Sequence, residues 1–349
     1  MSVPEGAPVR ALKQEQEPAS EEVVEVAPGI LRMQLPINFT GLGHVNMYGL
    51  VDKRGITVVD PGLPDGMSWG AITTRLAVAG FSLDRVHSVV VTHSHPDHFG
   101  GAGRLADETG ARVITHTDFV VPWLAGREPD LATLDDEFLR RRAPWSNEPI
   151  QLSDEQRRAG AAFGGGGDFP PPTPTTRLRH GEETELGQRR WVALHTPGHT
   201  ADHLCLYDRD TGVLLTGDHV LPSITPHIAG TGSSEDVLSD YLTSLEEVAK
   251  LPVALALPAH GHPFTDVEAR VVAINDHHRR RLEQLRRIGA AIGTAPVTEY
   301  ARQLFSQDHW GFMAQSETYA HLEHLRLRGE ALAVEEAGEI RFSIAELTA

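Results

Sequence analysis

The chain has 349 residues, 40% of them hydrophobic, which is enough for a large core and a second, smaller domain. Its formal net charge of −17 argues against non-specific nucleic-acid binding, which depends on a basic surface. A single cysteine excludes an internal disulfide framework, and no apolar run approaches the ~18 residues of a membrane span, so we expect a cytoplasmic protein.

The first part of the chain predicts a leader followed by strands. Residues 1–20 are polar and rich in Pro and Glu, as in a disordered leader. Val23–Pro36 has the composition of a strand, and Asn46–Asp60 that of a hairpin turning at Lys53-Arg54-Gly55. A helix is expected over Met67–Ala79, with Gly80 just past its end.

Strands and helices then alternate. The apolar Val89–Val91 predicts a buried strand, followed by a helix over Ala102–Thr109 and a strand over Arg112–Thr115. Beyond Gly181 the expected order is strand, loop, hairpin, loop, helix over Ser234–Lys250, strand and loop. Such an order predicts a layered α/β fold, with its site at the strand ends.

The segment His93-Ser94-His95-Pro96-Asp97-His98 is the clearest functional signal. It places four side chains that can bind metal directly after a buried strand. Buried histidines and carboxylates are costly unless they are paired or bind a metal. In an extended segment His93 and His95 project from one face, and the turn at Pro96 lets Asp97 and His98 face a neighbouring point. The spacing suggests two adjacent metals; the alternative is a His-rich exposed loop.

Three later segments repeat this setting, an apolar strand followed by a small residue and one potential ligand. The ligands are His199, Asp218 and His260. Taken alone, each would more often be a satisfied histidine or a turn aspartate, so the repetition carries the argument.

Together these segments resemble the metallo-β-lactamase superfamily. The motifs stand in the family's order: Thr92–Gly101 (THSHPDHFGG), Thr196–His203 (TPGHTADH), Thr216–Asp218 (TGD) and Ala259–Gly261 (AHG). The resemblance extends roughly from Glu22 to Phe264. It implies that residues 21–265 form an αββα sandwich, two sheets between layers of helices, with a metal-dependent hydrolase site.

The resemblance also implies a role for each ligand. Two zinc ions would be held by seven side chains: His93, His95 and His199 for the first, Asp97, His98 and His260 for the second, and Asp218 for both. Iron or manganese could occupy the same donors. Two such metals lower the pKa of a shared water, so that a bridging hydroxide attacks the substrate. Asp97 would also act as a catalytic residue by orienting that hydroxide.

Some positions have two interpretations. Asp60 matches a family position that supports the ligands from behind, but a turn-forming Asp before Pro61 fits as well. His203 is our second catalytic candidate, through contact with the substrate; a supporting histidine fits equally. His219 and His262 flank two ligands and receive no role.

One departure from the β-lactamase pattern bears on function. The true β-lactamases of the superfamily carry a Cys where this chain has Asp218. A carboxylate there resembles the glyoxalase-II, lactonase, thioesterase and phosphodiesterase branches. The cysteine of this chain, Cys205, lies in the apolar Leu204–Tyr207 and is interpreted as a packed strand residue. We therefore do not expect antibiotic hydrolysis.

Residues 117–180 form an insertion of uneven character. It opens with a helical stretch of aromatic residues that includes Trp123 and Trp145, carries Arg140–Arg142, and ends in Gly164–Gly167 and Pro170–Pro172. Long loops inside compact domains are often functional lids. We hypothesise a lid over an acyl or aromatic substrate; the alternative is a surface hairpin that packs its aromatic residues onto the sandwich.

Residues 266–349 predict a small C-terminal domain. Apolar residues at helical spacing run from Val267 to Ile288, and helices over Val297–Phe305 and Ser316–Arg328 precede a hairpin turning near Ala337-Gly338. Three helices and a hairpin resemble a winged helix, which acyl thioesterases and an endoribonuclease of the superfamily carry. With 13 acidic against 10 basic residues, we expect a structural or homodimer-forming module, not a DNA-binding one.

Three functions remain to be compared. The leading hypothesis is a di-zinc hydrolase of thioesters or related acyl esters and lactones, with acyl-CoA or a carrier-protein thioester as substrate. A phosphodiesterase or endoribonuclease could use the same metals, but the acidic balance disfavours it. A non-catalytic metal-binding regulator is the third; the intact ligand set argues against it.

Overall fold

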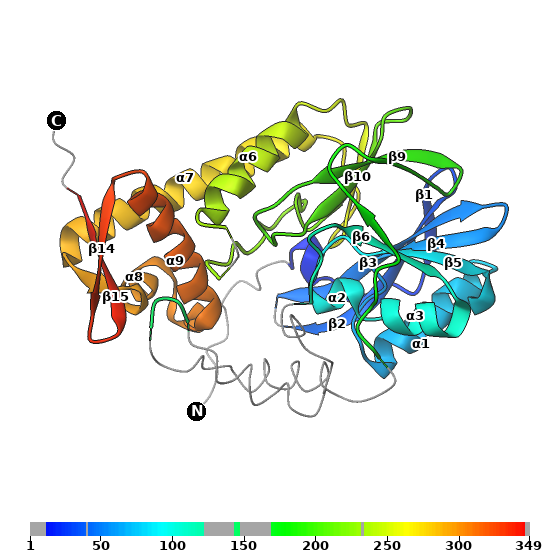
Figure 1. Ribbon diagram of the computed structural model, residues 1–349, viewed down its shortest axis with the longest axis horizontal. Coiled ribbons are helices and arrows are strands. Elements are labelled where there is room, and N and C mark those ends of the chain that lie inside the picture. The colour runs from blue at the N-terminus through cyan, green and yellow to red at the C-terminus, as the bar shows by residue number, and fades with distance from the viewer. Residues whose placement is uncertain (1–11, 40, 122–142, 147–168, 232–233, 346–349) are drawn as a thin grey trace, which may run out of the picture.

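The computed structural model describes residues 12–39, 41–121, 143–146, 169–231 and 234–345 (Figure 1). They form two central β-sheets flanked by helices and, at the C-terminal side, a smaller unit of helices and a hairpin. Within this part of the chain, every helix is too short or too polar to traverse a bilayer.

The first sheet contains seven strands in chain order. The first four pair antiparallel, and the remaining three extend the sheet in parallel. The strands are β1 (Val23–Ala27), β2 (Ile30–Phe39), β3 (Leu42–Asp52), β4 (Gly55–Val59), β5 (Val86–Val90), β6 (Arg112–His116) and β7 (Thr176–Leu178). The hairpin that turns at Lys53-Arg54 is confirmed, whereas the segment Val23–Pro36, expected as a single strand, forms the antiparallel pair of β1 and β2.

The second sheet contains five strands, of which only β11 and β12 pair in parallel. Its order is β12 (Leu255–Pro258), β11 (Val213–Gly217), β10 (Leu204–Asp208), β9 (Arg189–His195) and β8 (Glu183–Leu186). The predicted succession of strand, hairpin, helix and strand is confirmed, with β8 as an additional edge strand.

Helices cover the outer faces of both sheets. They are α1 (Gly66–Val78), α2 (Pro96–Phe99) and α3 (Ala102–Thr109) on the first, and α6 (Val237–Ala249) and α7 (Val267–Ile292) on the second. Successive strand residues point to opposite layers, because side chains alternate along a strand. Val89 packs outward with α1 and α3, whereas Val90 packs inward with Trp191 of the second sheet. This αββα layering confirms the predicted fold class.

The C-terminal unit contains the three predicted helices and the hairpin. It consists of α7, β13 (Ala295–Pro296), α8 (Val297–Leu304), α9 (Phe312–Leu327), β14 (Ala331–Glu336) and β15 (Glu339–Ile344). One hydrophobic cluster runs from Tyr241 of α6 through Ile274 of α7 to Leu322 of α9 and Phe342 of β15. The unit therefore packs directly on the helical layer of the second sheet, while its likeness to a winged helix stays a prediction.

Two predicted segment boundaries are wrong. Residues 12–20 do not belong to a disordered leader, because a 3-10 helix, η1 (Gln14–Gln16), buries Glu15 completely. The predicted insertion over residues 117–180 contains β7, an edge strand that pairs with β6. Short 3-10 turns also form at η2 (Leu83–Arg85) and η3 (Gln307–His309). The polar composition of residues 1–20 favoured a disordered leader, because composition does not reveal the distant residues, such as Ser223, that Glu15 binds.

Two aromatic residues of the insertion belong to the core. Phe119 is buried, with its ring centroid 6.4 Å from that of Phe99. Trp145 is buried beside Phe312 of α9, and its indole N–H donates to Oε1 of Gln315 at 3.1 Å. Trp123, Leu124, Phe138 and Arg140–Arg142 lie outside the described residues, so the lid stays a prediction.

Replacing Trp145 with alanine should destabilise the protein strongly. The indole is 1% exposed, so its loss removes a large apolar contact and leaves a cavity between the insertion and α9. We expect Trp145→Ala to lower the free energy of unfolding by about 3–5 kcal/mol, measured by urea denaturation. Trp310→Ala is the matched control, because Trp310 is 47% exposed and should cost about 1 kcal/mol or less. Equal losses would contradict the described packing of Trp145.

Candidate metal centre

Parallel strand pairs bring the predicted ligands to one edge of the sandwich. β4 and β5 are parallel neighbours, so Asp60 and the segment 92–98 leave the first sheet side by side. β11 and β12 are parallel too, with Gly217 opposite Pro258, which places Asp218 near His260. The chain thus delivers ligands from both sheets to the same point.

Hydrogen bonds join the two sheets at this edge. The N–H of Leu204 in the second sheet donates to Thr92 O at 2.8 Å. The N–H of Asn46 in the first sheet donates to Ala259 O at 2.6 Å, and its side-chain amide donates to Pro258 O and Gly261 O, both at 2.8 Å. The ligand loops therefore start from a frame that is fixed on both sides.

All seven predicted ligands converge in two adjacent groups. Within each group, one donor atom of every residue lies within 4.8 Å of the others: His93, His95, His199 and Asp218 in the first, Asp97, His98 and His260 in the second. Nδ1 of His95 and Nε2 of His199 are 3.0 Å apart, close enough to share one ion.

Asp218 lies between the two groups. Its Oδ2 is 3.5 Å from Nε2 of His199, while its Oδ1 is 3.3 Å from Nε2 of His260. Asp97 faces the second group, with Oδ2 3.4 Å from Nε2 of His260 and 3.5 Å from Nε2 of His98. Oδ2 of Asp218 is also 3.6 Å from Nε2 of His98, so this carboxylate contacts imidazoles of both groups.

Unpartnered buried atoms test whether these residues fit metal ions. Nε2 of His93, His98 and His260 and Oδ1 of Asp218 are buried and have no hydrogen-bond partner among the described residues. Each such atom costs about 1–3 kcal/mol when nothing satisfies it. Imidazole nitrogens and carboxylate oxygens are common ligands of divalent transition metals. The donor set therefore fits divalent metal ions.

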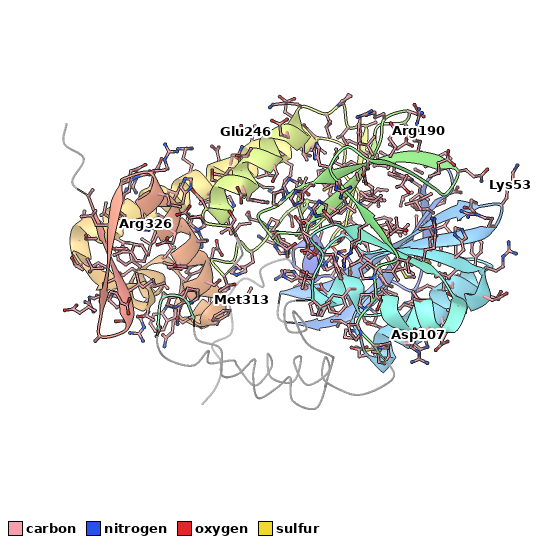
Figure 2. All side chains as sticks on the ribbon, in the orientation of Figure 1. Lys53, Asp107, Arg190, Glu246, Met313 and Arg326 are labelled. Carbon is pink, nitrogen blue, oxygen red and sulfur yellow. The ribbon has the colours of Figure 1, made fainter. Side chains whose placement is uncertain are left out.

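The charges of the site also call for a cation. Whereas Lys53, Asp107 and Glu246 lie on the surface (Figure 2), Asp218 is buried. Burial opposes its ionisation, but the adjacent His260 and His98 outweigh this and hold the pKa of Asp218 well below its usual value. Burial likewise opposes a charge on His260, yet Asp218 and Asp97 raise the pKa of His260 to about 10. Protons or metal ions must balance these carboxylates.

His93 and His95 are held in the neutral state. Burial, followed by the neighbouring imidazoles, lowers the pKa of His93 well below its usual value. Burial and the proximity of His199 lower the pKa of His95 to about 3. A neutral imidazole keeps the lone pair that binds a metal, so both side chains are in the ligating form at pH 7.

The second ring nitrogen of the ligands is engaged by the protein. Nδ1 of His93 is 3.0 Å from Oγ1 of Thr92 and that of His98 is 3.0 Å from Oδ2 of Asp60. Nδ1 of His199 is 2.8 Å from His227 O, and that of His260 is 2.7 Å from His44 O. Such partners fix the tautomer and direct Nε2 toward the metals.

Asp60 supports the ligands instead of serving only as a turn residue. Its Oδ1 accepts the N–H of Thr92 and its Oδ2 the hydroxyl of Thr92, both at 2.8 Å. Oδ2 also accepts a hydrogen bond from Nδ1–H of His98. Of the two interpretations given above, these contacts favour the supporting role.

His203 is oriented toward the backbone of the site. Its Nδ1 is 2.7 Å from Oγ1 of Thr196, and its Nε2 accepts the N–H of Asp218 at 3.1 Å. Gly217, with φ of +50°, permits this approach, because a Cβ there would lie 2.6 Å from Nε2 of His203. With both nitrogens engaged, the predicted catalytic role of His203 receives no support from these contacts.

The remaining ambiguous side chains stand apart from both ligand groups. His219 is buried with its ring centroid 5.4 Å from that of Tyr241. Nε2 of His262 lies 2.9 Å from Oε2 of Glu17. Cys205 is fully buried, and burial raises its pKa to about 12, in agreement with a packed strand residue.

Sequence reasoning missed several supporting residues. Thr92 and Thr196 are the first residues of the motifs Thr92–Gly101 and Thr196–His203, and this position was an available signal. His44 and His227 support ligands through main-chain oxygens, which any residue would provide. Nothing in their side chains could have identified them.

A third cluster of possible donors is poorly arranged for a metal. It consists of His116, Asp118 and His195. The rings of His116 and His195 stack 3.9 Å apart at an angle of 10°. The lone pairs of an imidazole lie in the plane of its ring. In two stacked, nearly parallel rings the lone pairs therefore lie in parallel planes and do not converge on one ion.

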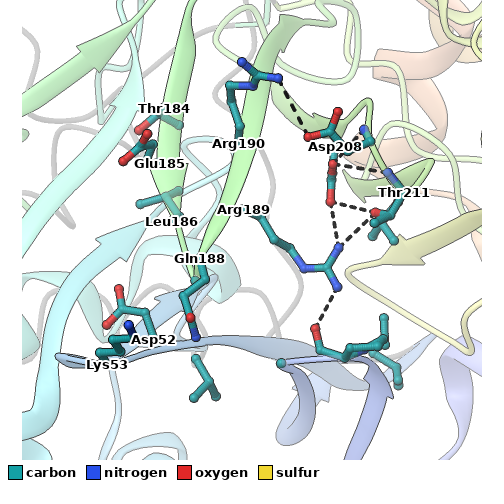
Figure 3. Close-up of a pocket in the computed structure, with 18 of the residues that line it drawn as sticks. Asp52, Lys53, Thr184, Glu185, Leu186, Gln188, Arg189, Arg190, Asp208 and Thr211 are labelled. Atoms are coloured by element: carbon teal, nitrogen blue, oxygen red, sulfur yellow. Dashed lines mark hydrogen bonds and ion pairs between the residues drawn. The ribbon is translucent and has the colours of Figure 1, made fainter.

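A groove of about 1610 Å³ lies at the opposite ends of the strands (Figure 3). Its central side chain, Arg189, is bound by Asp208 at 2.7 Å, Thr211 at 2.9 Å and Pro28 O at 2.7 Å. None of the predicted site residues is among the residues that line it. The groove is therefore separate from the two ligand groups.

Residues 40–260 match the family model of the metallo-beta-lactamase superfamily. The chain belongs to this superfamily. A metallo-beta-lactamase family protein from Thermus thermophilus superposes with a TM-score of 0.75 at 30% identity, covering 92% of this chain and 100% of that one. A beta-lactamase domain protein from Burkholderia ambifaria has a TM-score of 0.74 at 28% identity, covering 94% and 96%.

Relatives within the superfamily include named hydrolases. A probable metallo-hydrolase of Bacillus subtilis is 28% identical over 85% of this chain and 92% of its own length. Atrochrysone carboxyl ACP thioesterases of Aspergillus fumigatus and a Cryptosporiopsis species are 28% and 26% identical, and the matches span 40% and 65% of their lengths. Membership in the metallo-β-lactamase superfamily and the His/Asp clusters support a metal-dependent hydrolase.

Replacing Asp60 with asparagine should weaken metal binding. Asparagine tolerates the φ of +54° at this position. Its side chain has only one accepting oxygen, however, so it cannot replace both carboxylate oxygens that accept hydrogen bonds from Thr92 and His98. We expect about 10- to 100-fold lower zinc affinity in chelator competition. The exposed Asp84 provides the control variant Asp84→Asn. Unchanged affinity in Asp60→Asn would remove the supporting role of Asp60.

Proposed function

We propose that this protein is a di-zinc hydrolase of thioesters or of related acyl esters and lactones. The observation that carries the proposal is Asp218, whose carboxylate lies within 3.6 Å of imidazoles from both ligand groups. A carboxylate in this place is a hard ligand that suits bridging of two ions. The relatives named atrochrysone carboxyl ACP thioesterases support thioesters as the substrate class.

Bound metal ions would provide a water of lowered pKa and would polarise the carbonyl oxygen of the substrate. His93, His95 and His199 would hold one ion and His98 and His260 the other, with Asp97 and Asp218 as carboxylate ligands. Zinc fits this donor set, and iron or manganese would accept it as well.

The residues around the ions would control the position of the water and its proton. Asp97 contacts both His98 and His260 through Oδ2. We assign to its carboxylate the orientation of the attacking water and the acceptance of its proton. Attack on the thioester carbonyl then breaks the C–S bond, and the proton passes to the departing thiolate, which yields a carboxylic acid and a thiol.

Burial of the site favours this chemistry. His93, His98 and His260 are 0% exposed, so their electrostatic interactions act with little screening by water. The supporting contacts to Thr92, Asp60 and His44 hold the rings in advance of substrate binding. A preorganised site avoids the reorganisation that the same groups would need in water.

A substrate panel tests the proposal. We expect hydrolysis of acyl-CoA or carrier-protein thioesters by the zinc-loaded protein, and a decrease of kcat/KM by more than about 100-fold in Asp218→Ala, because loss of a shared ligand affects both ions. Asp210→Ala, at a side chain that is 70% exposed, is the control and should retain full activity. The measurement is steady-state kinetics with a thiol reagent, together with metal content.

Other outcomes would point to the other functions. Cleavage of single-stranded RNA without thioester hydrolysis would replace the thioesterase by a nuclease. Less than one metal ion per chain and no hydrolysis of thioesters, lactones or RNA would identify a non-catalytic protein.

A further inference from the structure

The N-terminal turn Gln14–Glu17 lies against loops that carry the metal ligands. Its Glu15 is fully buried. Oε1 of Glu15 accepts the N–H groups of Ser223 at 2.7 Å and Ile224 at 3.0 Å, and Oε2 accepts the hydroxyl of Ser223. A carboxylate that is buried with three donors holds those donors firmly in place.

Glu15 binds residues in the segment that connects β11 to α6. We call residues 218–231 of this segment the site loop. The site loop begins with the ligand Asp218 and contains His227, whose main-chain oxygen accepts Nδ1 of His199 at 2.8 Å. Any shift of the site loop would therefore move the acceptor that orients the imidazole of His199.

Two side chains of the C-terminal helices also contact the site loop. Arg270 of α7 donates to Leu221 O and Ile224 O, both at 2.6 Å. The imidazole of His227 is 3.7 Å from the carboxylate of Glu317 on α9. The site loop is thus held both by Glu15 and by residues of the C-terminal helices.

The same N-terminal turn reaches the second ligand group through His44. Nδ1 of His44 donates to Glu17 O at 2.7 Å, and Nε2 accepts the N–H of Gly261 at 3.1 Å. The main-chain oxygen of His44 then accepts Nδ1 of His260 at 2.7 Å. Gly43 permits this packing, because a Cβ there would lie 2.2 Å from Glu17 O.

We infer that the turn Gln14–Glu17 is a positioning element of the metal centre, and that Glu15 is the residue that sets the orientation of His199 through the site loop. This inference rests on the metal binding proposed above and not on the choice of thioester substrates. Glu15 contacts neither ligand group, so it is a positioning residue and not a catalytic one.

The experiment compares metal binding in Glu15 variants of the full chain. In Glu15→Ala both carboxylate oxygens are lost, and we expect zinc affinity, measured by chelator competition, to fall by about tenfold or more. Glu15→Gln keeps an oxygen for the two N–H groups and an amide for the Ser223 hydroxyl, so it should rescue affinity to within about twofold. Glu21→Ala, an exposed glutamate of the same segment, is the control.

The visible spectrum of the cobalt(II)-substituted protein gives a readout that a merely stabilising residue would not change. We expect altered d–d bands in Glu15→Ala and wild-type bands in Glu15→Gln. If Glu15→Ala does not fold, as judged by circular dichroism, Glu15→Asp takes its place with the same expected direction, because its carboxylate is withdrawn by one methylene.

Three results would overturn the inference. The first is a folded Glu15→Ala or Glu15→Asp protein with wild-type zinc affinity and cobalt spectrum, even at a lower melting temperature. The second is failure of both variants to fold, which would make Glu15 a residue of general stability. The third is a wild-type protein that binds no metal, which would overturn the proposed function as well; the first two leave that function intact.

Discussion

Burial of carboxylates at the edge where the two sheets meet is the constraint on which this site depends. Asp60, Asp97 and Asp218 are all nearly inaccessible to solvent. Buried negative charge is tolerated only where hydrogen bonds or cations compensate it. Here Thr92 and His98 satisfy Asp60. Asp97 and Asp218 face His98 and His260, whose Nε2 atoms have no hydrogen-bond partner among the described residues. The edge is therefore built for cations.

The sandwich creates this edge through its strand directions. Parallel pairing of β4 with β5 and of β11 with β12 aligns the strand ends, and hydrogen bonds from Leu204 and Asn46 connect one sheet to the other. Side chains alternate along each strand, so one face of the sheet packs against the helices and the other against the opposite sheet. The same packing that stabilises the core thus fixes the starting point of every ligand loop.

Two residues outside the ligand segments, Glu15 and Arg270, bind the site loop without providing a ligand. Glu15 near the N-terminus and Arg270 on α7 hold the same loop through opposite charges and complementary main-chain groups. This arrangement connects the C-terminal helices to the site loop through Arg270 of α7 and Glu317 of α9. It also connects the outer helical layer, through Tyr241 and Ile274, to the loop that carries Asp218.

The sequence by itself, together with its resemblance to the superfamily, predicted the fold class, most helices and strands, and the seven side chains that the structure brings together in two groups. These features have local signals: apolar periodicity, glycine at helix ends, and His or Asp directly after a buried strand. His93 to His98 could be identified because spacing along one segment already limits where side chains point.

Only the tertiary structure decided which groups support those ligands. It assigned Asp60 to His98, turned His203 toward the backbone of Asp218, and made Glu15 part of the core. It also placed β7 in what looked like a continuous insertion. These contacts join residues far apart in the chain, often through main-chain oxygens that every residue possesses. Their partners depend on packing between the sheets, and no local pattern of side chains encodes that packing.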